Sequence, residues 1–229
     1  MLHPSEVLQL MQGAGGQVVA RKARQQVWSR RRLFGLRCDL QSLPPVRPAK
    51  FKVSMVPCSM APAEFFEEEL KDASGVDFLD VFIRRRMHQA GVKTLYWTQG
   101  PDGTPAYVQW LIAAANQERL HEFSPRRYPI LSSSESVILE GAYTFVKHRR
   151  SGVMADGMGQ LLRIASMQGA KQAFTYVGDD NDASLKGCAR VGFVLDHVRI
   201  NSRTAGFFRS AVRSVDASSR RMWTEATGS

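Results

Sequence analysis

The chain has few cysteines, and this scarcity excludes two common ways of stabilising a small protein. Its 229 residues contain only Cys38, Cys58 and Cys188, an odd number without any C-x-x-C spacing. A disulfide framework or a structural zinc site would need more cysteines at closer spacing. The histidines also lack the spacing of metal ligands, so we expect no metal and a reducing cytoplasm.

Long apolar runs are also missing. No stretch approaches the eighteen or so residues needed to span a bilayer. Near the N-terminus, Gln9, Gln12 and the glycines of residues 13–16 interrupt the apolar positions that a secretory signal would need. These patterns predict a cytoplasmic protein without a membrane span.

Acidic residues are scarce in the first 52 positions, where ten Lys and Arg face only Glu6 and Asp39. This segment therefore carries most of the net charge of +10. Such an asymmetry is typical of proteins that bind an anionic partner, such as nucleic acid, or that have a solvated basic surface. Nucleic acid is possible but not favoured here, because only Trp28 and Phe34 could stack on bases. Acids at positions 64–80 could instead pair with the basic segment.

Prolines divide the chain into three parts. Pro44, Pro45 and Pro48 mark a linker at residues 41–50, because proline interrupts helices and central strands. We expect residues 1–49 to be a basic extension of helices and a strand that packs on the domain. Residues 50–213 form the domain itself, beginning with a strand at 50–56, and residues 214–229 are a flexible tail.

The centre of the chain has the pattern of a phosphate-binding unit. An apolar, β-rich run at 137–146 is followed by a basic loop at 147–152 and a helical pattern at 154–168. A second strand at 173–177 and a second helix at 183–190 come next. Free backbone N–H groups at a helix start attract anions, and arginines in the loop add positive charge.

Two short motifs in this unit resemble the GCN5-related N-acetyltransferase (GNAT) superfamily. The family pattern Arg/Gln-x-x-Gly-x-Gly/Ala is matched by residues 149–154, and Asn-x-x-Ser-x-x-x-Tyr-x-x-x-Gly-Phe by residues 181–193. Met154 stands where the family has glycine or alanine, and Cys188 where it usually has tyrosine. The resemblance implies an α/β (α+β) fold with a mixed, mostly antiparallel sheet flanked by helices, and acetyl-coenzyme A as co-substrate.

The resemblance also implies a donor site. Its strand residues would pair with the pantetheine arm, its loop would hold the pyrophosphate, and the start of the next helix would contact pantetheine again. The corresponding residues are Thr144, Phe145 and Val146 on the strand, Arg149, Arg150, Ser151, Gly152, Val153 and Met154 in the loop, and Asn181 and Ser184 on the helix. For Asn181, a helix N-cap is an equally good explanation.

For catalysis, Glu140 is the leading candidate for the base that deprotonates an amine, with Glu135 and Tyr143 as alternatives. In the family a tyrosine at the position of Cys188 protonates the leaving thiolate. A thiol could do so more weakly, and a small buried cysteine that only packs is the alternative.

The resulting hypothesis is an N-acetyltransferase that moves an acetyl or related short acyl group from acyl-coenzyme A to a primary amine. The acceptor would be a small molecule or a protein, chosen by loops at 59–90 and 113–134. Two alternatives remain: an enzyme that acetylates RNA or aminoacyl-tRNA, and a non-catalytic coenzyme A-binding module. The sequence leaves the oligomeric state open.

Overall fold

The structure is a computed structural model that describes residues 4–58, 62–123, 131 and 133–228. Its α-helices are α1 (Pro4–Ala14), α2 (Gly16–Val27), α3 (Pro62–Asp72), α4 (Gly75–Gln89), α5 (Glu118–Phe123), α6 (Val153–Met167), α7 (Asp182–Arg190) and α8 (Ala217–Thr227). The strands are β1 (Trp28–Asp39), β2 (Val56–Pro57), β3 (Leu95–Gln99), β4 (Pro105–Ala113), β5 (Ser136–Thr144), β6 (Gln172–Gly178), β7 (Val194–Thr204) and β8 (Phe207–Arg213). Short 3-10 turns lie at Ala114–Asn116 and Val146–His148.

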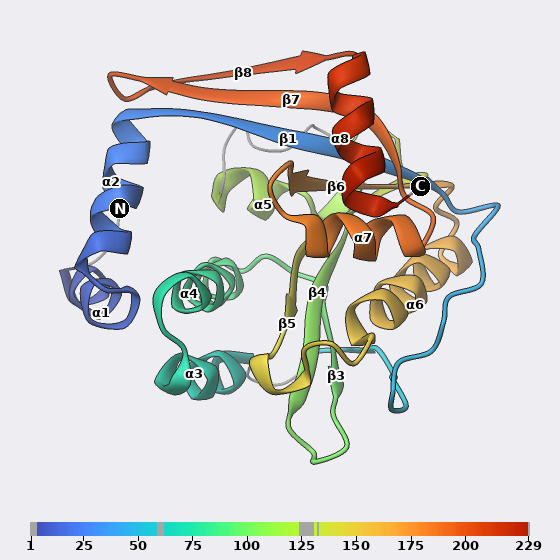
Figure 1. The fold of residues 1–229 in the computed structure, drawn as a ribbon. Coiled ribbons are helices and arrows are strands. Elements are labelled where there is room, and N and C mark those ends of the chain that lie inside the picture. Colours follow the sequence, from blue (N-terminus) through green and yellow to red (C-terminus); the bar gives the residue numbers. More distant parts are fainter. Residues whose placement is uncertain (1–3, 59–61, 124–130, 132, 229) are drawn as a thin grey trace.

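The strands form one eight-stranded sheet in the order β2-β3-β4-β5-β6-β1-β7-β8 (Figure 1). Only β5 and β6 pair in parallel, because α6 connects them; the other neighbours are antiparallel. The mixed, mostly antiparallel sheet with flanking helices confirms the fold class predicted from the sequence. None of the helices in the described part of the chain is both long enough and apolar enough to cross a membrane.

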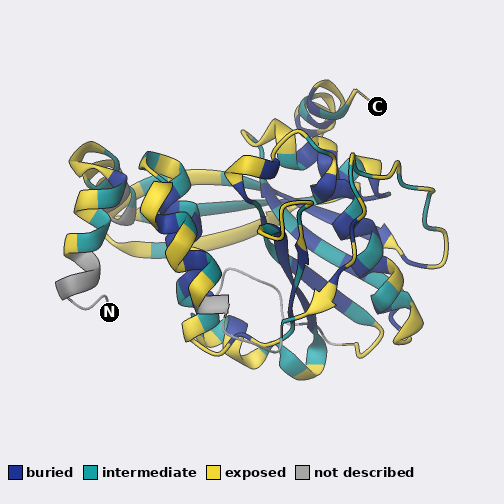
Figure 2. Cartoon of the chain, turned by 90° about the horizontal axis from the view of Figure 1, so that it is seen from below, coloured by how far each residue is buried: buried dark blue, intermediate teal, exposed yellow. Residues whose placement is uncertain are grey.

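Each face of the sheet has its own core. One face packs against α6, α7 and α8 around residues such as Phe34, Leu161 and Phe193. The other packs against α1 to α5 around Trp110, which is fully buried and donates its indole N–H to the carbonyl of Val92 at 3.0 Å. Buried positions therefore concentrate in the strands and in the helix faces turned toward them (Figure 2).

The N-terminal segment contributes a central strand to this sheet. Strand β1 pairs with β6 from Leu33 to Asp39 and with β7 along most of its length. Phe34 and Leu36 are fully buried on it. The sequence predicted a strand within the basic extension at 1–49, added to the domain, whereas the structure makes this strand an internal part of the sheet.

The C-terminal segment also differs from the expectation of a flexible tail over 214–229. Asp216 caps α8 by accepting a hydrogen bond from the Ser219 N–H at 2.7 Å. Trp223 and Ala226 are buried in the core beside α7. The small number of apolar side chains in this segment favoured a flexible tail. The prediction was wrong because these side chains recur on one helical face and pack into the core.

The strand expected at 50–56 is reduced to Val56–Pro57. The preceding residues run along α6, where side chains rather than a neighbouring strand satisfy their backbone. Asp156 accepts from the Ala49 N–H at 2.9 Å, and Gln160 bonds to both the N–H of Met55 and the carbonyl of Val53. Apolar alternation predicted the extended shape of this segment, but pairing depends on such distant partners.

Candidate functional site

Strands β5 and β6 separate from each other halfway along their length. Their parallel pairing extends only from Ser136 to Ile138 on β5 and from Gln172 to Phe174 on β6. Beyond this point β5 continues to Thr144 and β6 to Gly178 without pairing with each other. One edge of β5 is therefore left without a neighbouring strand, next to the N-termini of α6 and α7.

Strand β5 has a β-bulge against β4, just beyond the point where it leaves β6. Glu140 pairs with Trp110 and Tyr143 with Val108, so Gly141 and Ala142 together lie opposite the single residue Gln109. Gly141 has a φ of +66°, and a Cβ atom there would lie 2.6 Å from the Trp110 ring. Glycine is thus required at this position for both its conformation and its small size.

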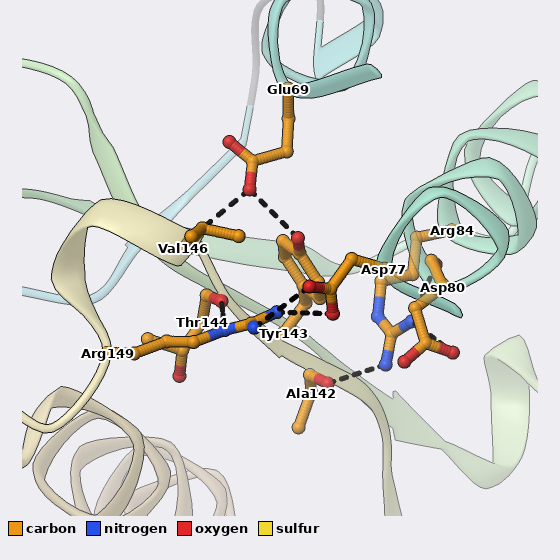
Figure 3. Close-up of polar contacts among 9 residues, drawn as sticks. All are labelled: Glu69, Asp77, Asp80, Arg84, Ala142, Tyr143, Thr144, Val146 and Arg149. Carbon is orange, nitrogen blue, oxygen red and sulfur yellow. Dashed lines mark hydrogen bonds and ion pairs between the residues drawn. The ribbon is translucent and has the colours of Figure 1, made fainter. Parts of the chain in front are cut away.

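Arg84 of α4 binds the backbone at this bulge. Its Nε donates to the carbonyl of Gly141 at 2.9 Å, and a terminal nitrogen donates to that of Ala142 at 2.7 Å (Figure 3). The other terminal nitrogen donates to the Asp80 carbonyl at 2.6 Å. The Arg84 side chain is only 15% exposed, and its guanidinium fixes α4 against the separated part of β5.

Glu69 of α3 binds the end of the same strand. One carboxylate oxygen accepts from the Tyr143 hydroxyl at 2.8 Å and from the Val146 N–H at 3.1 Å (Figure 3). Burial, together with this hydrogen bond to Glu69, raises the pKa of Tyr143 above its ordinary value, so the phenol keeps its proton. Tyr143 is thus a hydrogen-bond donor in this arrangement.

Arg149, the first residue of the basic motif, is paired with Asp77 of α4. Two parallel hydrogen bonds of 2.7 and 3.0 Å join the guanidinium to the carboxylate, and this pairing raises the pKa of Arg149 (Figure 3). The Arg149 Nε also lies 3.5 Å from the carbonyl of Thr144. Arg149 therefore points to α4.

The loop that follows is covered by the proline-rich linker. Gly152 caps α6 with a φ of +87°, and a Cβ atom there would lie 3.4 Å from the Cα of Ala49. The N–H of Lys50 donates to the carbonyl of Ser151 at 2.9 Å. The hydroxyl of Ser151 donates to the carbonyl of His148 at 2.6 Å. A Cβ atom 3.4 Å from Ala49 would be in ordinary van der Waals contact, so it is the left-handed φ that favours glycine at 152.

Beside the covered loop lies a basic pocket of about 650 Å³. We define it by its four cationic side chains, which come from the linker, the loop and the end of α7: Arg47, Lys50, Arg150 and Arg190. Within the described ranges none of the four forms an ion pair with a carboxylate, and Ser151 and Gly152 complete the wall. Four cations at the start of a helix form an electrostatic environment suited to phosphate groups.

The two departures from the family motifs have local explanations. Met154 packs over Gly187 of α7, where a Cβ atom would lie 3.0 Å from the Met154 Cε. A bulky residue on α6 is therefore accommodated by a glycine on the neighbouring helix. Val153, next to it, is buried in the core.

Cys188 is buried at 1% exposure beneath the sheet. Burial raises the pKa of its thiol to about 12, with a smaller contribution from Cys38. Such a thiol keeps its proton and has no contact with solvent. These properties support the packing role that the sequence left open; a role as general acid stays a prediction.

The remaining predicted residues lie at the ends of these elements. Asn181 caps α7 by accepting from the Ser184 N–H at 3.1 Å, so both residues serve the helix start. Phe145 is buried against Tyr143, and its N–H donates to the carbonyl of Ala106 on β4 at 3.1 Å. Glu140 is half-buried on the face of β5 that carries Trp110, toward α4.

Sequence reasoning missed Glu69, Asp77 and Arg84, and it gave the wrong partners to the acidic helices. In the described part of the chain, the acids of α3 and α4 pair with Lys71, Arg84, Arg85 and Arg149 rather than with the N-terminal arginines. Asp77, Asp80 and Arg84 are spaced so that they lie on one helical face, and this spacing could have predicted that Asp77 and Arg84 act together. Among the described residues no cluster of His, Cys, Asp or Glu could hold a metal ion.

Comparison with known proteins gives a consistent picture at the level of fold. The sequence matches no protein-family model and no curated protein. Among solved structures, the chain is similar to a GCN5-related glucosamine N-acetyltransferase region of a fungal multi-domain β-N-acetylglucosaminidase. The TM-score is 0.53 at 14% identity, over 80% of this chain and 22% of that one.

Two further structures are similar over most of the chain. A GCN5-related N-acetyltransferase from Sphaerobacter thermophilus has a TM-score of 0.50 at 10% identity, over 90% of this chain and 60% of that one. A functionally unknown conserved protein from Staphylococcus epidermidis has a TM-score of 0.50 at 8% identity, over 87% and 68%. The chain thus spans 22% and 60% of the length of the two acetyltransferase-related chains. Identities this low carry information about the fold alone.

Proposed function

The chain has the fold of the GCN5-related N-acetyltransferases, and on that premise we propose that it transfers an acetyl or related short acyl group from acyl-coenzyme A to an amine. The observation that carries this proposal is the basic pocket at the start of α6, the next α-helix in the chain after the part of β5 that separates from β6. A phosphate-rich, extended donor needs both features: cations for its phosphates and a free strand edge for its arm.

The residues present fit the phosphates of coenzyme A through charge. Arg47, Lys50, Arg150 and Arg190 would hold these groups, with the α6 N-terminus adding its dipole. Gly152 would supply the left-handed turn at the start of α6, where the linker also packs. The pantetheine arm would lie along β5 near Thr144 and Val146, where Arg84, Arg149 and Glu69 now bind the backbone.

Acyl-coenzyme A would supply an activated acyl group as a thioester. The amine nitrogen forms a bond to the acyl carbon, the carbon–sulfur bond breaks, and the departing thiolate takes a proton from water. Glu140 would accept the proton of the amine, because it is a carboxylate on β5 just beyond the pairing of this strand with β6. Arg84 would keep the bulge rigid beside it.

One observation favours a second candidate, the non-catalytic coenzyme A-binding module. The Val146 N–H and the Arg149 side chain are both engaged by carboxylates of α3 and α4. A module that only binds coenzyme A could use the basic pocket without exposing the strand edge. The two candidates differ in turnover and share the binding step.

Binding is tested by thermal unfolding with acetyl-coenzyme A. Ligand at 100 times its dissociation constant should add about 2.7 kcal/mol to the free energy of unfolding and so raise the melting temperature. The variant R150A/R190A should lose most of this shift. The variant R163A/K186A removes the same charge from exposed positions of α6 and α7 outside the pocket, and it should keep the shift. A wild type without any shift at millimolar ligand contradicts the proposal.

Turnover is tested with a panel of amines and the variant E140Q. If Glu140 is the base, this variant should bind acetyl-coenzyme A normally and turn over roughly 10²–10⁴-fold more slowly near neutral pH. The defect should shrink at high pH, where the amine loses its proton unaided. Donor binding without acetylation of any amine would favour the binding module. Equal activity of E140Q and wild type would place the base elsewhere, with Glu135 and Tyr143 next.

A further inference from the structure

The outer three strands of the sheet contain many arginines and no acidic residue at one end. In Figure 1, β1, β7 and β8 run together along the top of the molecule. Residues 28–33 and 199–213, which form this end of the three strands, include seven arginines and neither aspartate nor glutamate. Three of the arginines come from the N-terminal segment and four from the last quarter of the chain, so only folding brings them together.

The strand register arranges these residues in rows across one face. Trp28, Thr204 and Phe207 lie side by side in the outermost row. Arg30, Ser202 and Arg209 form the next row, followed by Arg32, Ile200 and Ala211. We name the two outer rows the arginine–aromatic platform: Trp28, Arg30, Ser202, Thr204, Phe207 and Arg209.

This platform is open, whereas the rows beside it are covered. Trp28 is 67% exposed and Phe207 is 77% exposed, unusually high fractions for large apolar side chains. Arg30 and Arg209 are exposed and form no ion pair with any residue that the structure describes. The next row inward is closed by α8, where Met222 accepts a hydrogen bond from Arg32 at 3.1 Å. A hollow of about 570 Å³ lies there, lined by Arg30, Arg32 and Met222 and also by Asp179 and Asp180. Asp179 pairs with Arg32 at 3.7 Å, so this inner hollow is not part of the platform.

The chemistry of the platform matches single-stranded nucleic acid. Guanidinium groups bind phosphates through two parallel hydrogen bonds, and exposed aromatic rings on a sheet offer stacking surfaces for unpaired bases. The two rows lie about 6.6 Å apart along the strands, and the outer strands about 9.6 Å apart across them. An extended strand can therefore contact rings and guanidinium groups alternately.

Two features favour RNA over the other anionic partners. The hydroxyls of Ser202 and Thr204 lie between the arginines and between the rings, where they can bond to a ribose 2′-hydroxyl. Arginines also occupy the reverse face of the same strands, at positions 31, 199 and 203, so a flat bilayer could contact only one set. A flexible RNA strand is not restricted to a flat surface in this way.

We propose that the arginine–aromatic platform binds single-stranded RNA. The sequence alone disfavoured nucleic acid, because the basic N-terminal run has too few stacking groups of its own. The fold supplies Phe207 and Arg209 from the other end of the chain. This inference does not depend on acyl transfer, since the platform and the basic pocket share no residue.

The test is fluorescence anisotropy of a short labelled oligouridylate with the full chain, across a salt series. We expect binding at low salt that weakens steeply as salt rises. The variant R30A/R209A should lower the magnitude of the salt slope by roughly 1.4, about 0.7 for each phosphate that is no longer neutralised. The variant W28A/F207A should keep the slope and weaken binding by roughly tenfold or more, because the bases no longer stack on these rings. The variant R163A/K186A, with the same charge change elsewhere, should bind like wild type.

A second readout uses the intrinsic fluorescence of Trp28. Stacking of a base on its ring should quench part of the tryptophan emission, and W28F should lose that quenching while still binding RNA. Circular dichroism and thermal unfolding show that each variant is folded.

The proposal is overturned if wild type binds no oligouridylate at low salt, or if R163A/K186A loses as much affinity as R30A/R209A. Equal affinity for the matching deoxy-oligonucleotide overturns the assignment to RNA. Binding to anionic lipid vesicles without binding to RNA assigns the platform to a membrane surface instead.

Discussion

Replacing Asp77 with asparagine should strengthen the binding of acetyl-coenzyme A. Asp77 holds Arg149 with two hydrogen bonds of 2.7 and 3.0 Å, and it directs the guanidinium toward α4. If Arg149 contributes to phosphate binding, it must first leave this carboxylate. An asparagine is nearly the same size but has no charge, so the competing interaction becomes weaker.

The size of the effect follows from the exposure of the pair. The side chains are 41% and 39% exposed, so solvent screens them, and such pairs stabilise by about 0–1 kcal/mol. The upper limit corresponds to a roughly fivefold lower dissociation constant. Isothermal titration calorimetry of wild type, D77N and R149A with acetyl-coenzyme A measures it. The gain should shrink at high salt, where screening already weakens the pair.

The charge-matched control is E118Q, which removes a carboxylate from an exposed position of α5. If D77N and E118Q have the same affinity, the pair does not compete with the donor. If R149A also binds like wild type, Arg149 is a structural residue that ties the loop to α4. That combination would refute the reasoning.

Two further predictions concern the bulge and the cysteines. G141A should lower the free energy of unfolding, measured in urea, by about 1 kcal/mol for the left-handed conformation and by about 1–3 kcal/mol more for overpacking against Trp110. The control G103A has a φ of +78° and no atom within 4 Å, so it should show only the first loss. Equal losses in the two variants would contradict the contact with Trp110. Burial raises the pKa values of the Cys38 and Cys188 thiols from 9.0 to about 11 and about 12. Iodoacetamide at pH 8 should therefore modify only Cys58 in the native protein, as measured by mass spectrometry. Alkylation of Cys188 in the native protein would contradict its burial. Because the unfolded thiols ionise first, stability should be complete below about pH 9 and fall as the pH rises toward 11 and 12.

The parts of the fold that the sequence predicted well are those defined by neighbouring residues. The strand at 137–146, the helix after Gly152 and the strand at 173–177 follow from apolar periodicity within short windows. Arg150 and Ser151 of the predicted loop line the basic pocket, and their contact with pyrophosphate stays a prediction. Local pattern was sufficient because these elements are consecutive in the chain.

What the sequence could not predict depends on contacts between distant segments. The position of β1 between β6 and β7 follows from pairing with residues near the other end of the chain. Glu69 reaches Val146, and Asp77 reaches Arg149, across the gap between the helices and the sheet. The linker covers Gly152 because Asp156 and Ser151 bind its backbone. None of these pairs has a spacing that a single sequence reveals.

The internal position of β1 has a consequence for synthesis on the ribosome. Phe34 and Leu36 are made early, but their partners on β6 and β7, among them Val177 and Val198, are made only in the last quarter of the chain. At typical elongation rates the nascent strand waits on the order of ten seconds without a partner, and its apolar side chains stay accessible to chaperones and to other chains. Closing a sheet over so long a separation is also entropically slow. The arginines that precede these side chains repel other copies of the nascent chain, and so they act as gatekeepers against aggregation until the sheet can close.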